Sequence, residues 1–461
     1  MDDPRRRNGG FEENTMAILD SSGIGGSQDI HDDRISFLEA VRYASLVSES
    51  PSVPSWNMYD ATFQILRDSR SLELAVASYQ LLIELDKRYP RVYCTNSGGI
   101  GELVFVKEAW SPFILGQEKS HGTGEGGSKS TDRLIDSLRF SVLIEDMAQA
   151  VKSMDFQLGL KPVEDMLLFQ YLVSVLEADF IHRHTLYKES LNWVLFRESM
   201  LNTLLGSRKL NFKSLVRDFM SLLLNQCQHH VRNSLPDTVG SCAISSHDSA
   251  FSLAIAFPEL ERRTCSAVQK LLTLVMEIDV IKKEADLLGV TSRIDGFRIP
   301  ILEIILDELT YNLNHVSSFL AVFSEPKWKL EIVLQYFSKY CMKSSVRTRR
   351  SNDTANDLTL ESVMNFFSTP TATKNIAKKV TSEVALLLLA HAFQVCVSQQ
   401  VDMNFSGYAS EKIGGTVSQI SSKFISAFHN LREVDEDLEI TPFEKEALFT
   451  AATILLQEPE N

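Results

Sequence analysis

Two groups of closely spaced basic residues are the side chains best suited to binding a charged ligand. They lie in the segments VRTRR and TKNIAKK and comprise Arg347, Arg349, Arg350, Lys374, Lys378 and Lys379. Such groups can contact the phosphates of nucleic acid or act as a nuclear import signal. They are also typical of a solvated loop followed by the start of a helix. The pattern predicts a candidate basic patch, and DNA contact is one interpretation of it.

The segment HGTGEGGSKST, at 121–131, is the nearest approach to a phosphate-binding loop. Its glycine spacing fits, but Ser128 separates Gly127 from Lys129. The lysine of such a loop must directly follow the last glycine to reach the β- and γ-phosphates. A second stretch, SGGIGELVF, lacks the third glycine of a dinucleotide fingerprint. We therefore predict a Gly/Ser-rich linker at 116–131 and no nucleotide cofactor.

Histidines and cysteines are also the usual zinc ligands, and several occur between residues 227 and 265. They are Cys227, His229, His230, Cys242, His247 and Cys265. Zinc normally takes its four ligands from close pairs such as C-x-x-C, and this spacing supplies none. The acidic run at 433–439 lacks the glycine and ligand order of a calcium loop, which favours a solvated loop. No metal is expected.

The sequence also lacks the motifs of common catalytic sites. His391 shares a helical face with Val384, Leu387 and Leu388, which favours a hydrogen-bonded core histidine over a catalytic one. No G-x-S-x-G, kinase or deaminase motif is present. We therefore expect a protein that is not an enzyme and has no small-molecule substrate.

Composition and charge narrow the protein class further. The 461 residues include 46 Lys+Arg and 60 Asp+Glu, a net charge of −14. This charge argues against coating nucleic acid or an anionic membrane, and it leaves room for a local, weak or indirect DNA contact. The six scattered cysteines are typical of a reduced intracellular protein. The most apolar stretch, Val384–Phe393, is half the length of a membrane-spanning helix, so no membrane association is expected.

Helical periodicity dominates the chain between these features. Apolar residues recur at steps of three and four in NFKSLVRDFMSLLL and again over 302–323. Gly289 is suited to ending the long helix that precedes it. The segment KWKLEIVLQYFSKYC is apolar on two faces, so it must be covered on both. Residues 91–115 are less helical and are compatible with an extended excursion.

These patterns predict an all-α protein. We expect an armadillo- or HEAT-like α-solenoid of degenerate repeats, with an irregular helical bundle as the alternative. The predicted organisation is a disordered tail at 1–30, a helical segment at 31–115, the linker at 116–131 and a main helical array at 132–461. Loop insertions are expected at 232–258, 343–372 and 401–415.

Long strings of residues resemble one known family. They include DDRISFLEAVRYASLV, LNWVLFRESMLNTLLGSRKLNFKSLV, DGFRIPILEIILDELTYNL, EPKWKLEIVLQYFSKY and ITPFEKEALFT. Together they resemble the plant negative regulators of systemic acquired resistance, which are nuclear armadillo-like proteins. The resemblance extends over nearly the whole chain and is weakest at 1–25, 116–131, 235–258 and 401–415.

The resemblance implies a nuclear, non-enzymatic regulator that restrains defence gene expression and homologous recombination. It also implies membership of the five/six-type SMC chromatin complex, as the sixth non-SMC element paired with the fifth, with a role in DNA repair. The alternative is a transcriptional corepressor scaffold that acts independently of that complex. A helical array offers long surfaces for partner helices, which agrees with either role.

Overall fold

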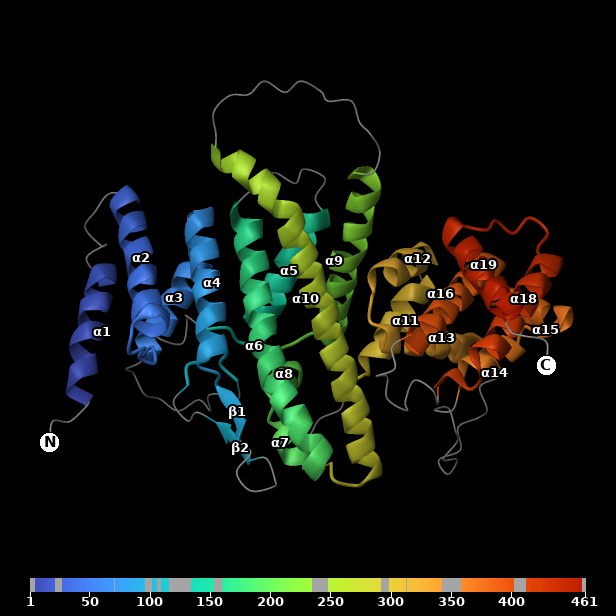
Figure 1. Ribbon diagram of the computed structural model, residues 1–461, viewed down its shortest axis with the longest axis horizontal. Helices are drawn as coiled ribbons and strands as arrows, with labels where there is room; N and C mark the ends of the chain where they lie inside the picture. Colours follow the sequence, from blue (N-terminus) through green and yellow to red (C-terminus); the bar gives the residue numbers. More distant parts are fainter. Residues whose placement is uncertain are drawn as a thin grey trace. The chain divides into compact units, whose positions relative to one another are not determined.

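A computed structural model describes most of the chain. The described residues are 5–20, 27–69, 71–95, 102–105, 109–115, 134–152, 160–233, 248–291, 298–311, 313–341, 358–401 and 412–457. Within them the regular secondary structure is helical apart from one two-stranded hairpin, β1 (Val92–Thr95) and β2 (Glu102–Phe105), paired antiparallel, and one isolated bridge between Phe113 and Ile135. The predicted all-α, solenoid-like fold is confirmed (Figure 1), and the hairpin lies within the expected extended excursion.

The chain divides into two compact units, Met1–Ile301 and Leu302–Asn461. The first contains the hairpin and ten helices over its described residues. The helices are α1 (Arg5–Asp20), α2 (Ser27–Arg42), α3 (Trp56–Arg67), α4 (Leu72–Arg88), α5 (Ser137–Lys152), α6 (Leu160–Ser190), α7 (Trp193–Arg197), α8 (Met200–Leu205), α9 (Phe212–Asn233) and α10 (Asp248–Leu287). A π-helical turn, Tyr43–Val47, extends α2.

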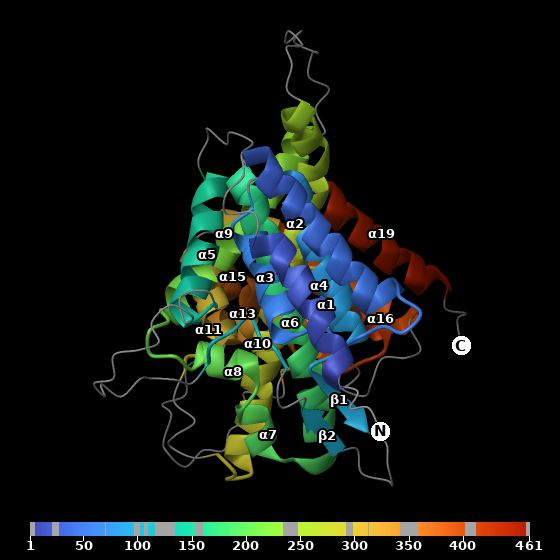
Figure 2. The same ribbon diagram turned by 90° about the vertical axis from the view of Figure 1, so that its left-hand side faces the viewer.

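The long helix α6 is the centre of the first unit. Residues 163–173 are buried without interruption, as expected for a helix covered on every side. Helices α3 and α4 pack on α6 from one direction, and α5 and α10 pack on it from others (Figures 1 and 2). Two of its buried polar side chains are paired with neighbouring segments. Ser69 donates to Glu164 at 2.9 Å, and the Gln170 amide donates to Thr264 of α10 at 2.9 Å.

The boundary between the two compact units follows Ile301 and does not lie at the expected linker, 116–131. Helices α3 and α4 precede that segment, and α6 follows it, yet their side chains form one core. Backbone hydrogen bonds also join the two sides of the segment. Ile135 N–H donates to the Pro112 carbonyl at 2.8 Å, and Ile114 N–H donates to the Ile135 carbonyl at 3.0 Å. The linker itself lies outside the described residues.

The expected N-terminal tail at 1–30 was wrong, because α1 and the start of α2 occupy its described part. Glycine and charge in RRRNGGFEEN favour disorder, but α1 packs against α2. Thr15 becomes buried there, and its hydroxyl donates to the Phe11 carbonyl at 2.9 Å. Tertiary contact thus outweighs the weak local propensity.

The second unit contains eight described helices with bounds in the structure. They are α11 (Ile301–Tyr311), whose first residue ends the first unit, α12 (Leu313–Val322), α13 (Pro326–Cys341), α14 (Leu360–Asn365), α15 (Pro370–Ala377), α16 (Ser382–Val401), α18 (Val417–Val434) and α19 (Pro442–Gln457). The expected two-sided burial of α13 is confirmed, since Ile332, Val333 and Tyr336 are all buried.

Helix α16 is long and apolar enough over Ser382–Gln399 to cross a membrane, beyond the shorter stretch recognised in the sequence. Within the second unit, 67% of that window is buried, as is typical of a core helix. It packs against α12, α13, α18 and α19. Its apolar composition is therefore explained by contacts inside this unit.

Parts of the expected loop insertions are also helical. Residues 248–258 belong to α10, which continues through Pro258. Within 343–372, α14 begins at a capping box formed by Thr359 and Ser362, and α15 begins with Thr369 as N-cap and Pro370 in the first turn. Short polar residues and proline are typical of loops, but here they lie at the N-terminal ends of helices, where they are equally common. Residues 342–357 and 402–411 lie outside the described chain.

Two glycines with positive φ provide a matched pair for a stability test. Gly289 follows α10 with φ +69° and confirms the expected helix end, while Gly414 precedes α18 with φ +80°. A Cβ at Gly289 would meet no atom within 4 Å, whereas one at Gly414 would lie 2.6 Å from Thr359 Oγ1 and 2.7 Å from its Cβ. Only Gly414 therefore combines backbone strain with a steric clash.

We predict that Gly289→Ala lowers the free energy of unfolding by about 1 kcal/mol and that Gly414→Ala lowers it by at least about 2 kcal/mol. Urea unfolding of the full chain, followed by circular dichroism, measures both changes. Equal losses in the two variants would contradict the role of the Thr359 contact.

Candidate functional site

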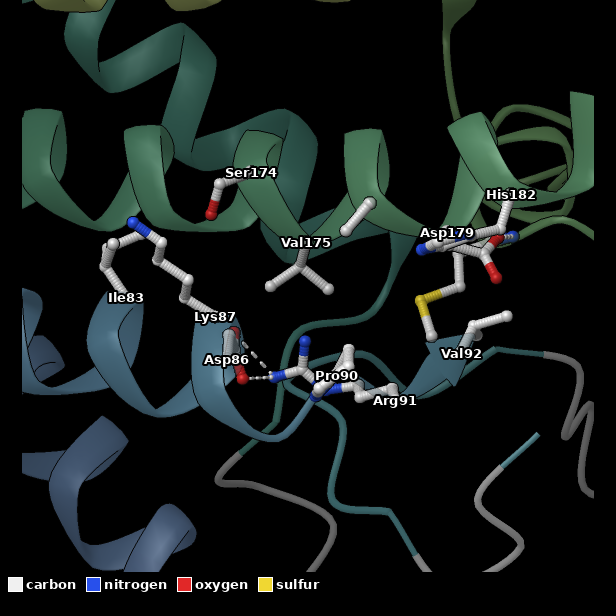
Figure 3. Close-up of a pocket in the computed structure, with 12 residues that line it drawn as sticks. Ile83, Asp86, Lys87, Pro90, Arg91, Val92, Ser174, Val175, Asp179 and His182 are labelled. Carbon is white, nitrogen blue, oxygen red and sulfur yellow. Dashed lines mark hydrogen bonds and ion pairs between the residues drawn. The ribbon is translucent and has the colours of Figure 1, made fainter. Parts of the chain in front are cut away.

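One arginine connects four parts of the first unit. The Arg91 side chain, 12% exposed, pairs with Asp86 of α4, which is 18% exposed. Its Nη2 lies 2.8 Å from Asp86 Oδ1 and donates to Oδ2 at 3.0 Å (Figure 3). The same nitrogen donates to the Tyr171 hydroxyl of α6 at 3.0 Å, and Nε donates to the Trp110 carbonyl at 2.7 Å. The guanidinium thus joins α4, the start of β1, the 109–115 segment and α6.

Aromatic rings surround this ion pair and link it to α3. The Arg91 guanidinium lies over the Trp110 ring, 5.7 Å from its centroid. Tyr59 of α3 stacks on Trp110 at 5.6 Å between centroids, with the planes 10° apart. Phe63 contacts both Trp110 at 5.3 Å and Tyr171 at 6.1 Å. Cation–π and aromatic contacts of this kind add to the burial of the rings.

Burial and the paired charges set the ionisation of this cluster. Burial raises the pKa of Asp86, and the Arg91 guanidinium and a hydrogen bond from Tyr171 oppose that rise. Burial also raises the pKa of Tyr171, as does the Asp86 charge. For Arg91, burial acts to lower the pKa, but Tyr171 and Asp86 outweigh it, and the pKa is raised. The cluster therefore holds a permanent cation beside neutral phenols, which suits fixing helices in place.

A small cavity of about 200 Å³ lies beside the ion pair, between α4, the start of β1 and α6 (Figure 3). Ile83 and Val175 supply apolar walls, and Asp179 lies at the far end. Asp179 is already engaged, because Oδ1 accepts from Arg183 Nε at 2.9 Å and Oδ2 accepts from the Met200 backbone N–H at 2.7 Å. Asp86, Arg91 and Asp179 beside this cavity thus serve the protein's own structure.

A third pair follows the same design near the end of the first unit. Asp279 of α10 forms a charge-assisted hydrogen bond with Arg298 and accepts the Ile301 backbone N–H at 2.7 Å, at the start of α11. The Arg298 guanidinium also lies 4.5 Å from the ring centroid of Phe212. Burial raises the pKa of Asp279, and the Arg298 charge opposes that rise. Largely buried Asp–Arg pairs thus fix the connections between helices in this unit.

The structure describes half of the candidate basic patch. Lys374 lies on α15, and Lys378 and Lys379 follow directly after it; all three are exposed. Arg347, Arg349 and Arg350 lie outside the described residues. The exposed lysines are available to a ligand, and the grouping of the six residues stays a prediction.

The structure also describes part of the candidate zinc ligands and the acidic run. Cys265 is buried, and its thiol lies 3.8 Å from the Leu222 carbonyl. The side chains of Cys227, His229, His230, Cys242 and His247 fall outside the described part. Among the described residues, no three His, Cys, Asp or Glu side chains are grouped as metal ligands. The acidic run at 433–439 covers the end of α18 and most of the connection to α19, and Glu436 and Asp437 there are exposed.

His391 is buried in α16, as expected for a core histidine. Its ring stacks on Phe443 at 4.2 Å between centroids. Burial, together with the nearby Lys329 charge, lowers the pKa of His391 to about 3. The expected hydrogen bond is not formed with any residue that the structure describes. The imidazole is therefore neutral at physiological pH.

We predict that Arg91→Ala lowers the free energy of unfolding by about 3 kcal/mol, because Asp86 would keep a largely buried, unpaired charge. Thermal unfolding of the full chain measures the loss. Arg262→Ala is the control, since it removes an exposed pair with Glu259 and should leave the transition unchanged. The double variant Asp86→Leu, Arg91→Met should recover part of the lost stability; no recovery would contradict the unpaired charge as the cause.

Comparison with known proteins places the chain in a family. Residues 91–325 match the model of the SNI1 middle domain, and residues 341–459 match that of the SNI1 C-terminal domain. The chain is 42% identical over 449 residues to the negative regulator of systemic acquired resistance SNI1 of Arabidopsis thaliana, covering 97% of this chain and 95% of that protein. Identity this high over nearly both full lengths shows common descent: the chain belongs to the SNI1 family of negative regulators of systemic acquired resistance.

Proposed function

We propose that this protein is a nuclear, non-enzymatic scaffold that negatively regulates systemic acquired resistance and defence gene expression. The observation that carries the proposal is the near full-length identity with the Arabidopsis regulator. An all-α, solenoid-like fold supports it, since helical arrays present extended surfaces to protein partners. The basic groups and the relative's regulatory role together favour the nucleus as its location.

We further propose that the scaffold acts as a subunit of the five/six-type SMC complex, in DNA repair and recombination. Its direct partner would be the fifth non-SMC element, as the sequence resemblance implies. Helix α19 offers a suitable surface: Phe449 is 74% exposed and Leu456 is 86% exposed. Residues seven positions apart lie on one helix face, the spacing with which partner helices are recognised.

We predict that the full-length tagged protein, purified from plant nuclei, brings down the SMC subunits and the fifth element in stoichiometric amounts. Phe449→Asp with Leu456→Asp should reduce that recovery at least tenfold, because burying a carboxylate in an apolar interface costs free energy. Lys445→Gln with Glu446→Gln, two exposed changes on the same helix, is the control.

Recovery of transcription factors without SMC subunits would overturn membership of the complex and support the corepressor role instead. Equal recovery with the aspartate and control variants would show that α19 is not the interface. Circular dichroism of each variant establishes that the helices are retained.

Any direct DNA contact would involve the exposed lysines of the second unit. We predict that Lys374→Gln, Lys378→Gln and Lys379→Gln together reduce the slope of log K against log salt by about one for each lysine, as loss of phosphate contacts requires. Binding to a labelled DNA duplex at several salt concentrations measures the slope. The control removes Arg208, Lys209 and Lys213, which are exposed in the first unit. An unchanged slope in the lysine variant would refute the patch.

A further inference from the structure

A larger cavity lies within the second unit, between α12, α13, α16 and α19, and has a volume of about 720 Å³. Volumes of 300–1,000 Å³ are typical of binding sites. Leu320, His391 and Val395 are buried and form its floor, while Ser317 and Thr441 are exposed at its rim. The cavity is thus open to solvent on one side and apolar at its base.

Lys329 of α13 lines this cavity. It differs from other buried or half-buried basic side chains of the protein in its lack of a carboxylate partner among the described residues. It is half-buried, and burial lowers its pKa. Arg91, Arg183 and Arg298 each face a carboxylate, and Lys412 lies 3.8 Å from Glu331. Lys329 has no ion pair or hydrogen bond from its ammonium group to any residue that the structure describes. A half-buried cation without a partner is unfavourable unless a ligand supplies the missing anion.

The starts of two helices also make the cavity suited to an anion. Pro326 and Pro442, the first residues of α13 and α19, both line it, so the positive ends of two 16-residue helices lie there. The carboxylate in the first turn of α19, Glu444, is already engaged, since Oε2 accepts the Thr441 backbone N–H at 2.7 Å. It therefore serves as a helix cap.

His391 is the second polar group directed to this space. It is 7% exposed, lines the cavity, and is held in orientation by its stack on Phe443. Its ring nitrogens have no hydrogen-bond partner within the described chain. A neutral imidazole carries one N–H and can therefore donate one hydrogen bond to an oxygen that enters beside Lys329.

We propose that this cavity binds the carboxylate side chain of an acidic peptide segment from a partner protein. Lys329 pairs with the carboxylate, His391 donates a hydrogen bond to it, and Leu320 and Val395 pack against the methylene groups. The exposed rim, contributed by separate helices, lets the peptide backbone cross the opening while one side chain enters. The choice of a protein occupant rests on the scaffold function proposed above; the anion chemistry rests on the cavity alone.

The test uses the purified full chain and a displayed library of random twelve-residue peptides. Selection on the wild type should enrich peptides with Asp or Glu at one fixed position between apolar residues. The best peptide should bind Lys329→Gln at least tenfold more weakly than the wild type, and its own Glu→Gln version should lose a similar factor. Lys327→Gln, which removes the same charge two residues away on α13, should bind as the wild type does.

Two more measurements separate binding from folding. Lys329→Gln should melt no lower than the wild type, because an unpaired charge is removed, and the bound peptide should raise the melting temperature of the wild type only. His391→Phe keeps the stack on Phe443 and should weaken the peptide severalfold. Failure to enrich an acidic position, or equal affinity for Lys329→Gln, would overturn the proposal.

A last experiment measures the binding of free acetate and of N-acetylglutamate to the same chain. Lys329-dependent binding of either acid as tightly as the peptide would show a site for small acids and overturn the peptide assignment. All these measurements use the isolated chain, so their outcome is independent of whether SMC subunits are recovered from nuclei.

Discussion

The contact between the Arg91 guanidinium and Asp86 is the interaction on which the arrangement of the first unit depends. Through the Tyr171 hydroxyl and the Trp110 carbonyl, the same group fixes α6 and the 109–115 segment against α4. Because a guanidinium has five donors in one plane, it can satisfy several acceptors from different elements at once. Removing it would leave acceptors from three elements without their shared donor.

The sequence identifies helices well where burial follows their own period. The 302–323 repeat corresponds to α11 and α12, and α13 was correctly expected to be covered on two faces. It fails where a distant contact decides the structure. Arg91 lies five positions from Asp86 but 80 from Tyr171, and no local pattern connects them. Helix α1 was missed for the same reason, since its support comes from α2.

The cavity of the second unit was equally hidden, because its lining comes from four helices spread over more than a hundred positions. His391 was recognised as a core residue from its helical face, and burial confirms this. Nothing in the segment KWKLEIV distinguishes the nearby Lys329 from a surface lysine. Only the packing of α13 against α16 shows that this lysine is half-buried, whereas the buried arginines of the first unit are paired with aspartates.

The contact of α4 with α6 has a consequence for how the chain can be divided. The match to the SNI1 middle domain begins at residue 91, directly between Asp86 and the hairpin. A fragment starting there would retain Arg91 but lose its carboxylate partner and the helices that cover one side of α6. By contrast, a break between residues 115 and 134 keeps Arg91 with Asp86. It places α3 and α4 on one fragment and α6 on the other, and the hydrogen bonds of Ile135 with Pro112 and Ile114 cross it. Two polypeptides divided at that point therefore keep complementary surfaces and should reassemble as a split protein.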